Sequence, residues 1–93
     1  MLDGVSDSEK RPKRRSAARA APETTALVAS LGERFKAIRL RRGLTQQEAA
    51  TRAGITLGHL QVVERGTGNP TIAVIAALAR AYEVTLLEVF ARV

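Results

Sequence analysis

The 93-residue chain contains no cysteine, no tryptophan and a single histidine, and aromatic residues make up only 3% of it. Without cysteine the chain forms neither a disulfide nor a thiolate nucleophile. Cysteine usage therefore does not indicate whether the protein belongs to an oxidising or a reducing compartment. His59 has no companions in the sequence that would complete a metal site. Paired carboxylates, a nucleophile beside a base and a phosphate-binding loop are also missing, and we therefore expect no enzymatic activity, no metal and no cofactor.

Long apolar segments are missing as well. No run approaches the roughly 20 residues that span a bilayer, and the N-terminal MLDGVSDSEK lacks the apolar stretch of a secretory signal. We therefore expect a soluble, cytoplasmic protein without a membrane partner. The length allows one domain at most, and a domain of this size buries only about 60% of its unfolded surface, which leaves little room for a deep catalytic cleft.

The chain does have an excess of positive charge. Fifteen lysines and arginines against nine acidic residues give a net charge of +6, and a small basic protein most often has a polyanion as its partner. Residues 1–23 have almost no large apolar side chains, so we expect them to form a flexible basic tail. This tail either follows phosphates or a minor groove, or is a solvated segment that aids solubility. Its clustered basic residues are Lys10, Arg11, Lys13, Arg14 and Arg15.

Closely spaced helix signals begin at about residue 24, without the alternation typical of strands. The motifs SLGE, TQQE and TLLE predict capping boxes that start helices at Ser30, Thr45 and Thr85. Glycines suited to a helix end occupy positions 43, 54 and 66. The sequence therefore predicts an all-α domain over residues 24–93 with five short helices, at about 30–42, 46–53, 57–65, 72–82 and 86–92. The alternative for the first helix is a backward extension through ETTALVAS, favoured by Leu27 and Leu31 four residues apart and opposed by Gly32.

The predicted helices carry apolar residues at the helical period, which defines their inward faces. The expected core comprises Leu31, Phe35, Ile38, Leu60, Val63, Ile72, Ile75, Leu78, Ala79, Tyr82, Leu86, Leu87 and Phe90. The final segment LLEVFARV has more apolar surface than one small core needs. We therefore expect a symmetric homodimer, the alternative being a last helix that only covers its own core. The residues expected in the dimer interface are Leu86, Val89, Phe90 and Val93.

The short link AGIT between the second and third predicted helices carries the main functional signal. A turn of this length makes two helices cross at a steep angle, with Gly54 in the turn and Ile55 plugging the core beneath it. This is the geometry of a helix-turn-helix, whose second helix enters the major groove of DNA. Over residues 31–90 the chain resembles the Cro and phage-repressor type of helix-turn-helix protein, the XRE family, in the motifs LGERFKAIR, RGLTQQEAA, AGIT, ERGTGNPT and YEVTLLEVF.

The resemblance implies a five-helix, lambda-repressor-like DNA-binding domain with double-stranded DNA as its partner. It also implies a structural salt bridge between Arg39 and Glu64, which joins the first and third helices. Gln46, in the first turn of the second helix, is the position that typically bonds a phosphate or a base edge. The full set of implied DNA contacts is Gln46, Gln47, Thr56, Leu57, Gly58, Gln61, Val62, Arg65, Thr67 and Asn69.

The sequence departs from the family pattern on the face that would read DNA. Members of the family commonly carry Arg, Gln, Ser or Asn at positions 57, 58 and 62, whereas Leu57, Gly58 and Val62 offer no side-chain hydrogen bond. Thr56 and Gln61 remain as hydrogen-bonding readers. We therefore expect specific recognition to be weak or to depend on the shape of the DNA.

Two functions remain open at this point. The first is a nucleoid-associated transcriptional regulator that binds a palindromic operator as a homodimer, with recognition helices about 34 Å apart. The second is an antitoxin-like or adaptor module that binds a protein through the apolar face of the third helix or through the tail. The first is favoured, because the fold, the charge and Gln46 all indicate DNA binding.

Overall fold

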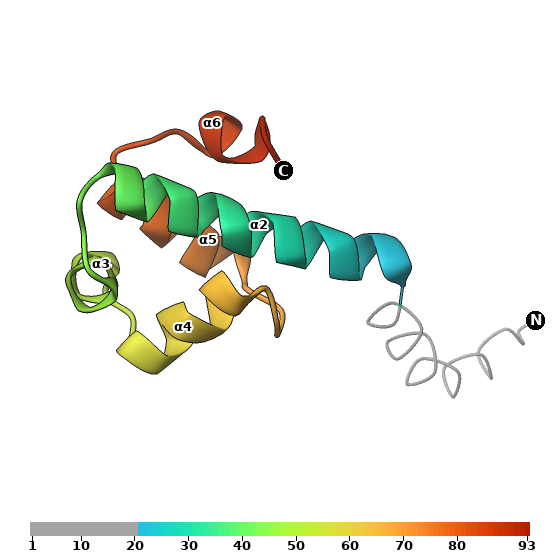
Figure 1. Ribbon diagram of the computed structural model, residues 1–93, viewed down its shortest axis with the longest axis horizontal. Coiled ribbons are helices and arrows are strands. Elements are labelled where there is room, and N and C mark those ends of the chain that lie inside the picture. Colours follow the sequence, from blue (N-terminus) through green and yellow to red (C-terminus); the bar gives the residue numbers. More distant parts are fainter. Residues whose placement is uncertain (1–20) are drawn as a thin grey trace, which may run out of the picture.

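The computed structural model describes residues 21–93, so the basic cluster from Lys10 to Arg15 that is predicted to belong to a flexible tail lies outside the described residues. Within them the chain forms helices and no strand (Figure 1). The helices are α2 (Pro22–Arg41), α3 (Gln46–Ala53), α4 (Leu57–Arg65), α5 (Ile72–Ala81) and α6 (Leu86–Phe90). The prediction of an all-α domain built from five helices is confirmed.

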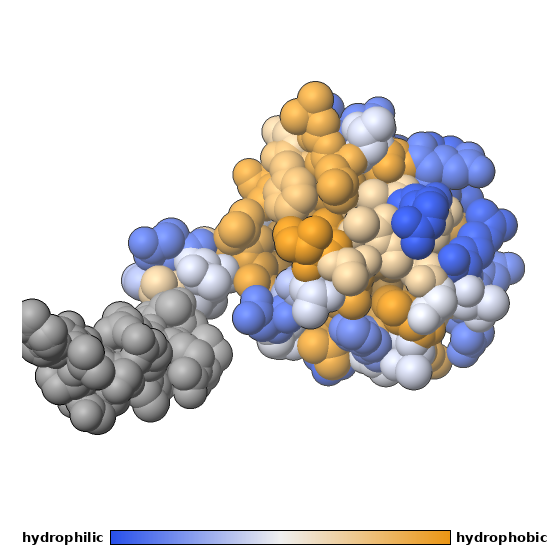
Figure 2. All heavy atoms as spheres, turned by 180° about the vertical axis from the view of Figure 1, so that it is seen from behind, coloured by the Kyte–Doolittle hydropathy of each residue, from blue (hydrophilic) through white to orange (hydrophobic). Residues whose placement is uncertain are grey.

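The domain is arranged around α2, its longest helix (Figure 1). In this view α3 and α4 lie below α2, α6 lies above it and α5 lies behind it. From the opposite side, hydrophobic residues gather over α5 and α6 (Figure 2). No helix in the described part of the chain is both long and apolar enough to cross a membrane.

The first helix differs most from its predicted bounds. It begins at Pro22 rather than near residue 30, because proline at the first helical position sacrifices no hydrogen bond and the residues after it contain no helix breaker. Ser30 therefore lies inside α2, and the predicted capping box at SLGE is wrong. The additional turns extend past the rest of the domain toward the N-terminus (Figure 1).

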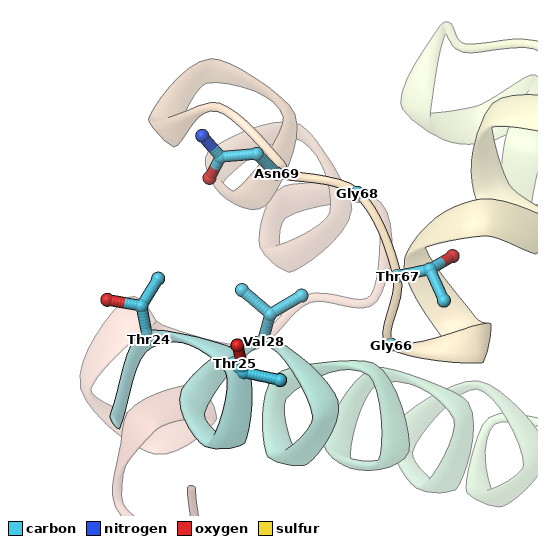
Figure 3. Close-up of a pocket in the computed structure, with 7 residues that line it drawn as sticks. All are labelled: Thr24, Thr25, Val28, Gly66, Thr67, Gly68 and Asn69. Atoms are coloured by element: carbon cyan, nitrogen blue, oxygen red, sulfur yellow. The ribbon is translucent and has the colours of Figure 1, made fainter. Parts of the chain in front are cut away.

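Gly32 marks the place where α2 and the end of α4 approach most closely. A Cβ atom at Gly32 would overlap the carbonyl oxygen of Val63 and lie 2.9 Å from the amide nitrogen of Gly66. Gly66 ends α4 in the left-handed conformation, and a Cβ there would lie 2.8 Å from the Cα of Ala29. Figure 3 shows how closely the chain around Gly66 passes over α2. Glycine inside α2 is thus explained by backbone packing, although it lowers helix propensity by about 1 kcal/mol.

Threonine hydroxyls begin the four shorter helices. Thr45, Thr56, Thr71 and Thr85 each accept a hydrogen bond from the amide three residues further on. The predicted capping boxes at TQQE and TLLE are confirmed, since each glutamate also accepts the amide of its threonine. These bonds, the backbone bond first, hold the pKa of the Glu48 and Glu88 carboxyls below the usual range.

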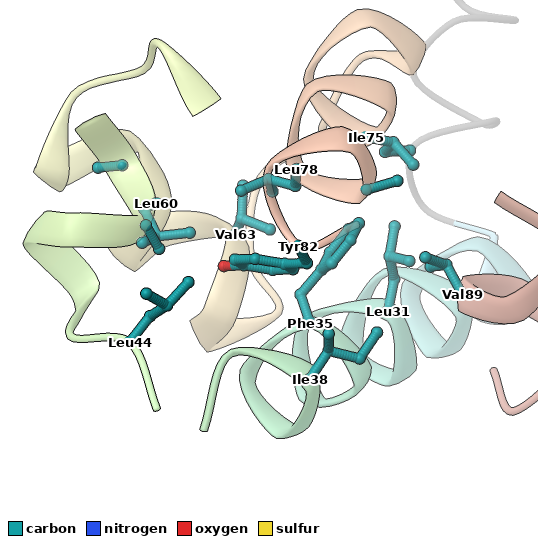
Figure 4. Close-up of a cluster of buried hydrophobic side chains, with 13 residues drawn as sticks. Leu31, Phe35, Ile38, Leu44, Leu60, Val63, Ile75, Leu78, Tyr82 and Val89 are labelled. Atoms are coloured by element: carbon teal, nitrogen blue, oxygen red, sulfur yellow. The ribbon is translucent and has the colours of Figure 1, made fainter. Parts of the chain in front are cut away.

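The core is a single cluster to which all five helices contribute (Figure 4). Phe35 and Tyr82 meet edge to face at its centre, with ring centroids 6.1 Å apart. Burial raises the pKa of the Tyr82 hydroxyl to about 12. The largest fully buried side chains are Tyr82, Phe35, Ile38, Leu60, Leu78 and Val89, and all except Val89 belong to the predicted core.

Five apolar positions differ from a predicted exposure, four that were expected in the core and one that was expected in the dimer interface. Ile72 and Leu87, predicted in the core, are 71% and 81% exposed. Val89 is fully buried, so its prediction as a dimer contact is wrong. The reason is that α6 has only five residues, too few for a helical period to define a face, and its single turn directs Val89 into the core. Leu86 and Phe90 are 42% and 39% exposed, so their prediction in the core is wrong, whereas their prediction as dimer contacts stays a prediction. Val93, also predicted in the dimer interface, is partly buried against the core.

Replacing the same residue type in two helices tests the close contact at Gly32. Gly32→Ala should lower the free energy of unfolding by about 1–3 kcal/mol, because the methyl group has no room. Gly58→Ala should raise it by about 1 kcal/mol, because a Cβ at Gly58 meets nothing within 4 Å and alanine favours the helix. Urea titrations followed by circular dichroism measure both. A Gly32→Ala variant as stable as the parent would show that α2 and α4 are not in contact there.

Candidate nucleic-acid interface

Helices α3 and α4 form a helix-turn-helix. The amide of Ile55 donates to the carbonyl oxygen of Ala50 at 3.0 Å, and Gly54 takes a φ of 76° to turn the chain. Ala49 and Ala50 are fully buried, so their small side chains let α3 pack closely on its neighbours. Ile55 packs against the core beneath the turn. These contacts fix the direction in which α4 leaves the turn.

The helix α4 has a buried face and an accessible face. Leu60, Val63 and Glu64 are buried. Gly58 and Arg65 are exposed. The remaining implied DNA contacts on this helix, Leu57, Gln61 and Val62, are partly exposed. The side chains expected to face a DNA groove are therefore reachable from solvent.

Two of the implied DNA contacts lie at the two ends of α4 and hydrogen-bond to its backbone. The Thr56 hydroxyl accepts the amide of His59 at 3.0 Å and caps the start of the helix. At the other end, the amide and hydroxyl of Thr67 both lie 3.4 Å from the carbonyl oxygen of Val62. The capping role of Thr56 could have been read from its position directly before a helix. Its hydroxyl still has one proton to donate.

A buried ion pair joins α2 to α4. Arg39 donates from Nε to Oε2 of Glu64 at 2.6 Å and from Nη2 to Oε1 at 3.1 Å. Its Nη1 donates to the carbonyl oxygen of Leu44 at 2.8 Å, which ties down the loop before α3. Arg39 and Glu64 are only 6% and 9% exposed. Hydrogen bonding to Glu64 raises the pKa of Arg39, so the guanidinium stays charged.

Two glutamine side chains extend this network toward the surface. Nε2 of Gln46 donates to Oε1 of Glu64 at 3.0 Å, and Nε2 of Gln61 lies 3.4 Å from Oε1 of Gln46. The amide of Gln46, implied as a phosphate or base contact, is thus held between α3 and α4. Gln47 behaves differently, because its Nε2 donates to Oγ1 of Thr51 along the exposed side of α3 at 3.2 Å.

Five of the ten implied DNA contacts line two hollows. One, of about 390 Å³, is lined by Lys36, Gln46, Gln61, Glu64 and Arg65. Sequence reasoning missed Lys36, although its position three residues before Arg39 on the same helix was a usable signal. The other hollow, of about 590 Å³, separates the start of α2 from the loop after α4 (Figure 3). It is lined by Thr24, Thr25, Val28, Gly66, Thr67, Gly68 and Asn69.

Neither hollow is suited to a metal ion. Among residues 21–93, no group of three or more histidine, aspartate or glutamate side chains is arranged to hold one. The first hollow instead combines two cationic side chains with two amides, which are the groups that bind phosphates and base edges.

Comparison with known proteins agrees with this geometry. Residues 35–89 match the helix-turn-helix family. The chain belongs to this family. The match confirms the XRE-type resemblance seen in the sequence, and it contains the whole of α3, α4 and α5.

Individual relatives of this helix-turn-helix protein include two from bacteria and one from a phage. An uncharacterized HTH-type transcriptional regulator of Sinorhizobium fredii is 38% identical over 58 residues, or 62% of this chain and 75% of the relative. The immunity repressor protein of Bacillus phage phi105 is 38% identical over 52 residues, or 56% of this chain but only 36% of the repressor. The crystal structure of the restriction-modification controller protein C.AhdI from Aeromonas hydrophila superposes with a TM-score of 0.68 at 31% identity, over 70% of this chain and 98% of that one.

Removing an arginine from a buried and from an exposed ion pair tests what holds α4 in place. Arg39→Ala should cost about 3–5 kcal/mol of stability, because it leaves the Glu64 carboxylate buried without its partner. Arg42→Ala should cost less than about 1 kcal/mol, since Arg42 and Glu83 are exposed and 3.8 Å apart. Thermal and urea unfolding of the two variants measure the difference. Equal losses would mean that the buried pair does not anchor α4.

Proposed function

We propose that this protein is a transcriptional regulator that binds double-stranded DNA, with α4 lying in the major groove. The observation that carries the proposal is the position of α4. Its inner face is fixed by the core and the Arg39–Glu64 pair, and its outer face is open beside a hollow flanked by Lys36 and Arg65. Family membership and the net charge of +6 support the same conclusion.

Binding strength and sequence readout come from different residues in this proposal. Lys36 and Arg65 supply charge for phosphates, which position a protein without carrying sequence information. Leu57, Gly58 and Val62 contribute only apolar contacts, for instance to thymine methyl groups. Direct readout of the operator therefore depends on few contacts, and Thr56 and Gln61 are the hydrogen-bonding side chains left to make them.

We also propose that the protein acts as a homodimer on a palindromic operator. Leu86, Leu87 and Phe90 present exposed apolar surface on α6, and Ile72 does so at the start of α5. Hydrophobic residues gather on the side of the molecule that α5 and α6 form (Figure 2). A symmetric pair of domains would place two copies of α4 about one DNA turn apart. Relative to the sequence prediction, Leu87 and Ile72 take the place of Val89 in this interface.

The salt dependence of DNA binding tests the first proposal. Binding to a random-sequence duplex, followed by fluorescence anisotropy, should weaken steeply as salt rises. Arg65→Ala should weaken binding to all duplexes alike. It should also lower the slope of the logarithm of the affinity against the logarithm of the salt concentration by about 1. Arg80→Ala removes the same charge from an exposed site on α5 and should leave the slope unchanged. No binding at low salt would reject the regulator and favour a protein-binding adaptor.

Charge placed on α6 tests the homodimer. Leu87→Glu should convert the protein from dimer to monomer in sedimentation equilibrium, without loss of helix, because Leu87 is 81% exposed. Leu40→Glu is the matched control at a leucine that is 58% exposed on α2. Leu40 follows Lys36 by four residues and so lies on the side of α2 that lines the hollow. An unchanged dimer in Leu87→Glu would place the interface elsewhere.

A further inference from the structure

The hollow that α2, α3 and α4 share has one lysine on its edge, Lys36. The chain has three lysines, Lys10, Lys13 and Lys36, and its other cationic side chains are arginines. An arginine stays protonated at neutral pH, whereas a lysine amine can be acylated and then loses its charge. Within residues 21–93, Lys36 is therefore the one side chain whose positive charge acylation can remove.

The carboxylate that lines the same hollow leaves this amine available. Both oxygens of Glu64 accept hydrogen bonds from Arg39, at 2.6 and 3.1 Å. Its Oε1 accepts another from Gln46 at 3.0 Å. The ion pairs among the described residues do not include Lys36, and its side chain is exposed. The amine can therefore meet a molecule that enters the hollow from solvent.

The hollow also favours anions. Lys36 and Arg65 line it together with two side-chain amides, and the charge of Glu64 is balanced by Arg39. Cations that face one recess raise the local concentration of a molecule that carries phosphate. A phosphate held by Arg65 brings a carbonyl group bonded to it within reach of Lys36. The volume of about 390 Å³ has room for a small molecule of this kind.

We propose that Lys36 is an acylation site and that its reagent is an acyl phosphate, the mixed anhydride of a carboxylic acid and phosphate. The unprotonated amine of Lys36 attacks the carbonyl carbon, so that a C–N bond forms and the C–O bond to phosphate breaks. The electron pair of that C–O bond leaves with the phosphate. The proton that the nitrogen loses passes through water to the departing phosphate, and the product is a neutral Nε-acyl-lysine.

Acylation of Lys36 regulates DNA binding, a consequence that rests on the proposed function. The modified side chain has an amide in place of the ammonium group, so it no longer attracts a DNA phosphate. Because a phosphate of DNA and the acyl phosphate compete for the same cations, a bound duplex protects Lys36. The free protein is therefore modified faster than the DNA-bound protein.

Chemical labelling of the full chain tests the site without DNA. After treatment with acetyl phosphate, mass spectrometry of peptides gives the acetylation rate of each lysine. Arg65→Ala should slow the reaction of Lys36 about 5-fold, the effect of one charge at close range in water, and leave Lys10 and Lys13 unchanged. Arg80→Ala, a matched change on α5, should leave all three rates unchanged. Acetic anhydride carries no phosphate and should label Lys36 equally in all three proteins.

DNA binding of the acetylated protein tests the consequence. Lys36→Arg is the control, because it keeps the positive charge at this position and still carries the modified Lys10 and Lys13. After complete reaction, the parent should bind a random-sequence duplex about tenfold more weakly than Lys36→Arg at about 0.1 M salt, the loss of one phosphate contact. Unreacted Lys36→Gln should show the same deficit. Duplex added before acetyl phosphate should slow the acetylation of Lys36 in the parent.

Each contrary outcome overturns a different step. No acetylation of Lys36 while Lys10 and Lys13 react would overturn the site. Equal rates at Lys36 in the parent and in Arg65→Ala with acetyl phosphate would overturn the role of the hollow. Equal DNA binding by the acetylated parent and the acetylated Lys36→Arg variant would overturn the regulation. Acetylation of Lys36 as expected, with no DNA binding even at low salt, would overturn the proposed function and leave the site in place.

Discussion

The buried contact between Arg39 and Glu64 is the interaction on which the rest of the structure depends. It joins α2 to α4, and through Leu44 it also holds the loop that leads into α3. All three helices that surround the interface are therefore fixed relative to one charged pair. Such a pair adds little net stability over a well-packed apolar contact, but it gives a fixed geometry and a fixed hydrogen-bond direction. Gln46 donates to Glu64, and its own amide oxygen faces Gln61. Within the described residues, this is the only hydrogen-bonding network that reaches from the ion pair to the outer face of α4.

The close packing of α2 against the end of α4 also fixes the position of α4 relative to α2. Gly32 and Gly66 bring the two backbones together, and the loop after α4 leaves from that point (Figure 3). The helix α4 is thus held along its inner face and at its C-terminal end, while its outer face has few polar side chains. In the proposed function, charge at Lys36 and Arg65 gives affinity for phosphates, and the outer face of α4 makes the few contacts to bases.

Much of this fold could be predicted from the sequence, because its local signals agree with its packing. The threonine caps, the short AGIT turn and the core residues of α2, α4 and α5 follow local rules of capping and periodicity. The start of α2 was misjudged because SLGE satisfies a capping pattern inside a helix that Pro22 had already begun. Val89 was misjudged because one turn is too short for a period. Lys36 was missed although its spacing from Arg39 on α2 was a usable signal. The hydrogen bond between Gln46 and Gln61 depends on how α3 and α4 meet, which no local pattern encodes.

The central claim is that the α3–α4 face, and not the apolar α5–α6 side, meets DNA. Chemical-shift mapping of backbone and side-chain amides during titration with a random-sequence duplex at low salt tests it most directly. The account predicts shifts in the first turn of α3, along the outer residues of α4 and around Lys36, with the Gln46 and Gln61 side chains among those that move. Shifts confined to α5 and α6, with the α4 amides unchanged, would contradict it.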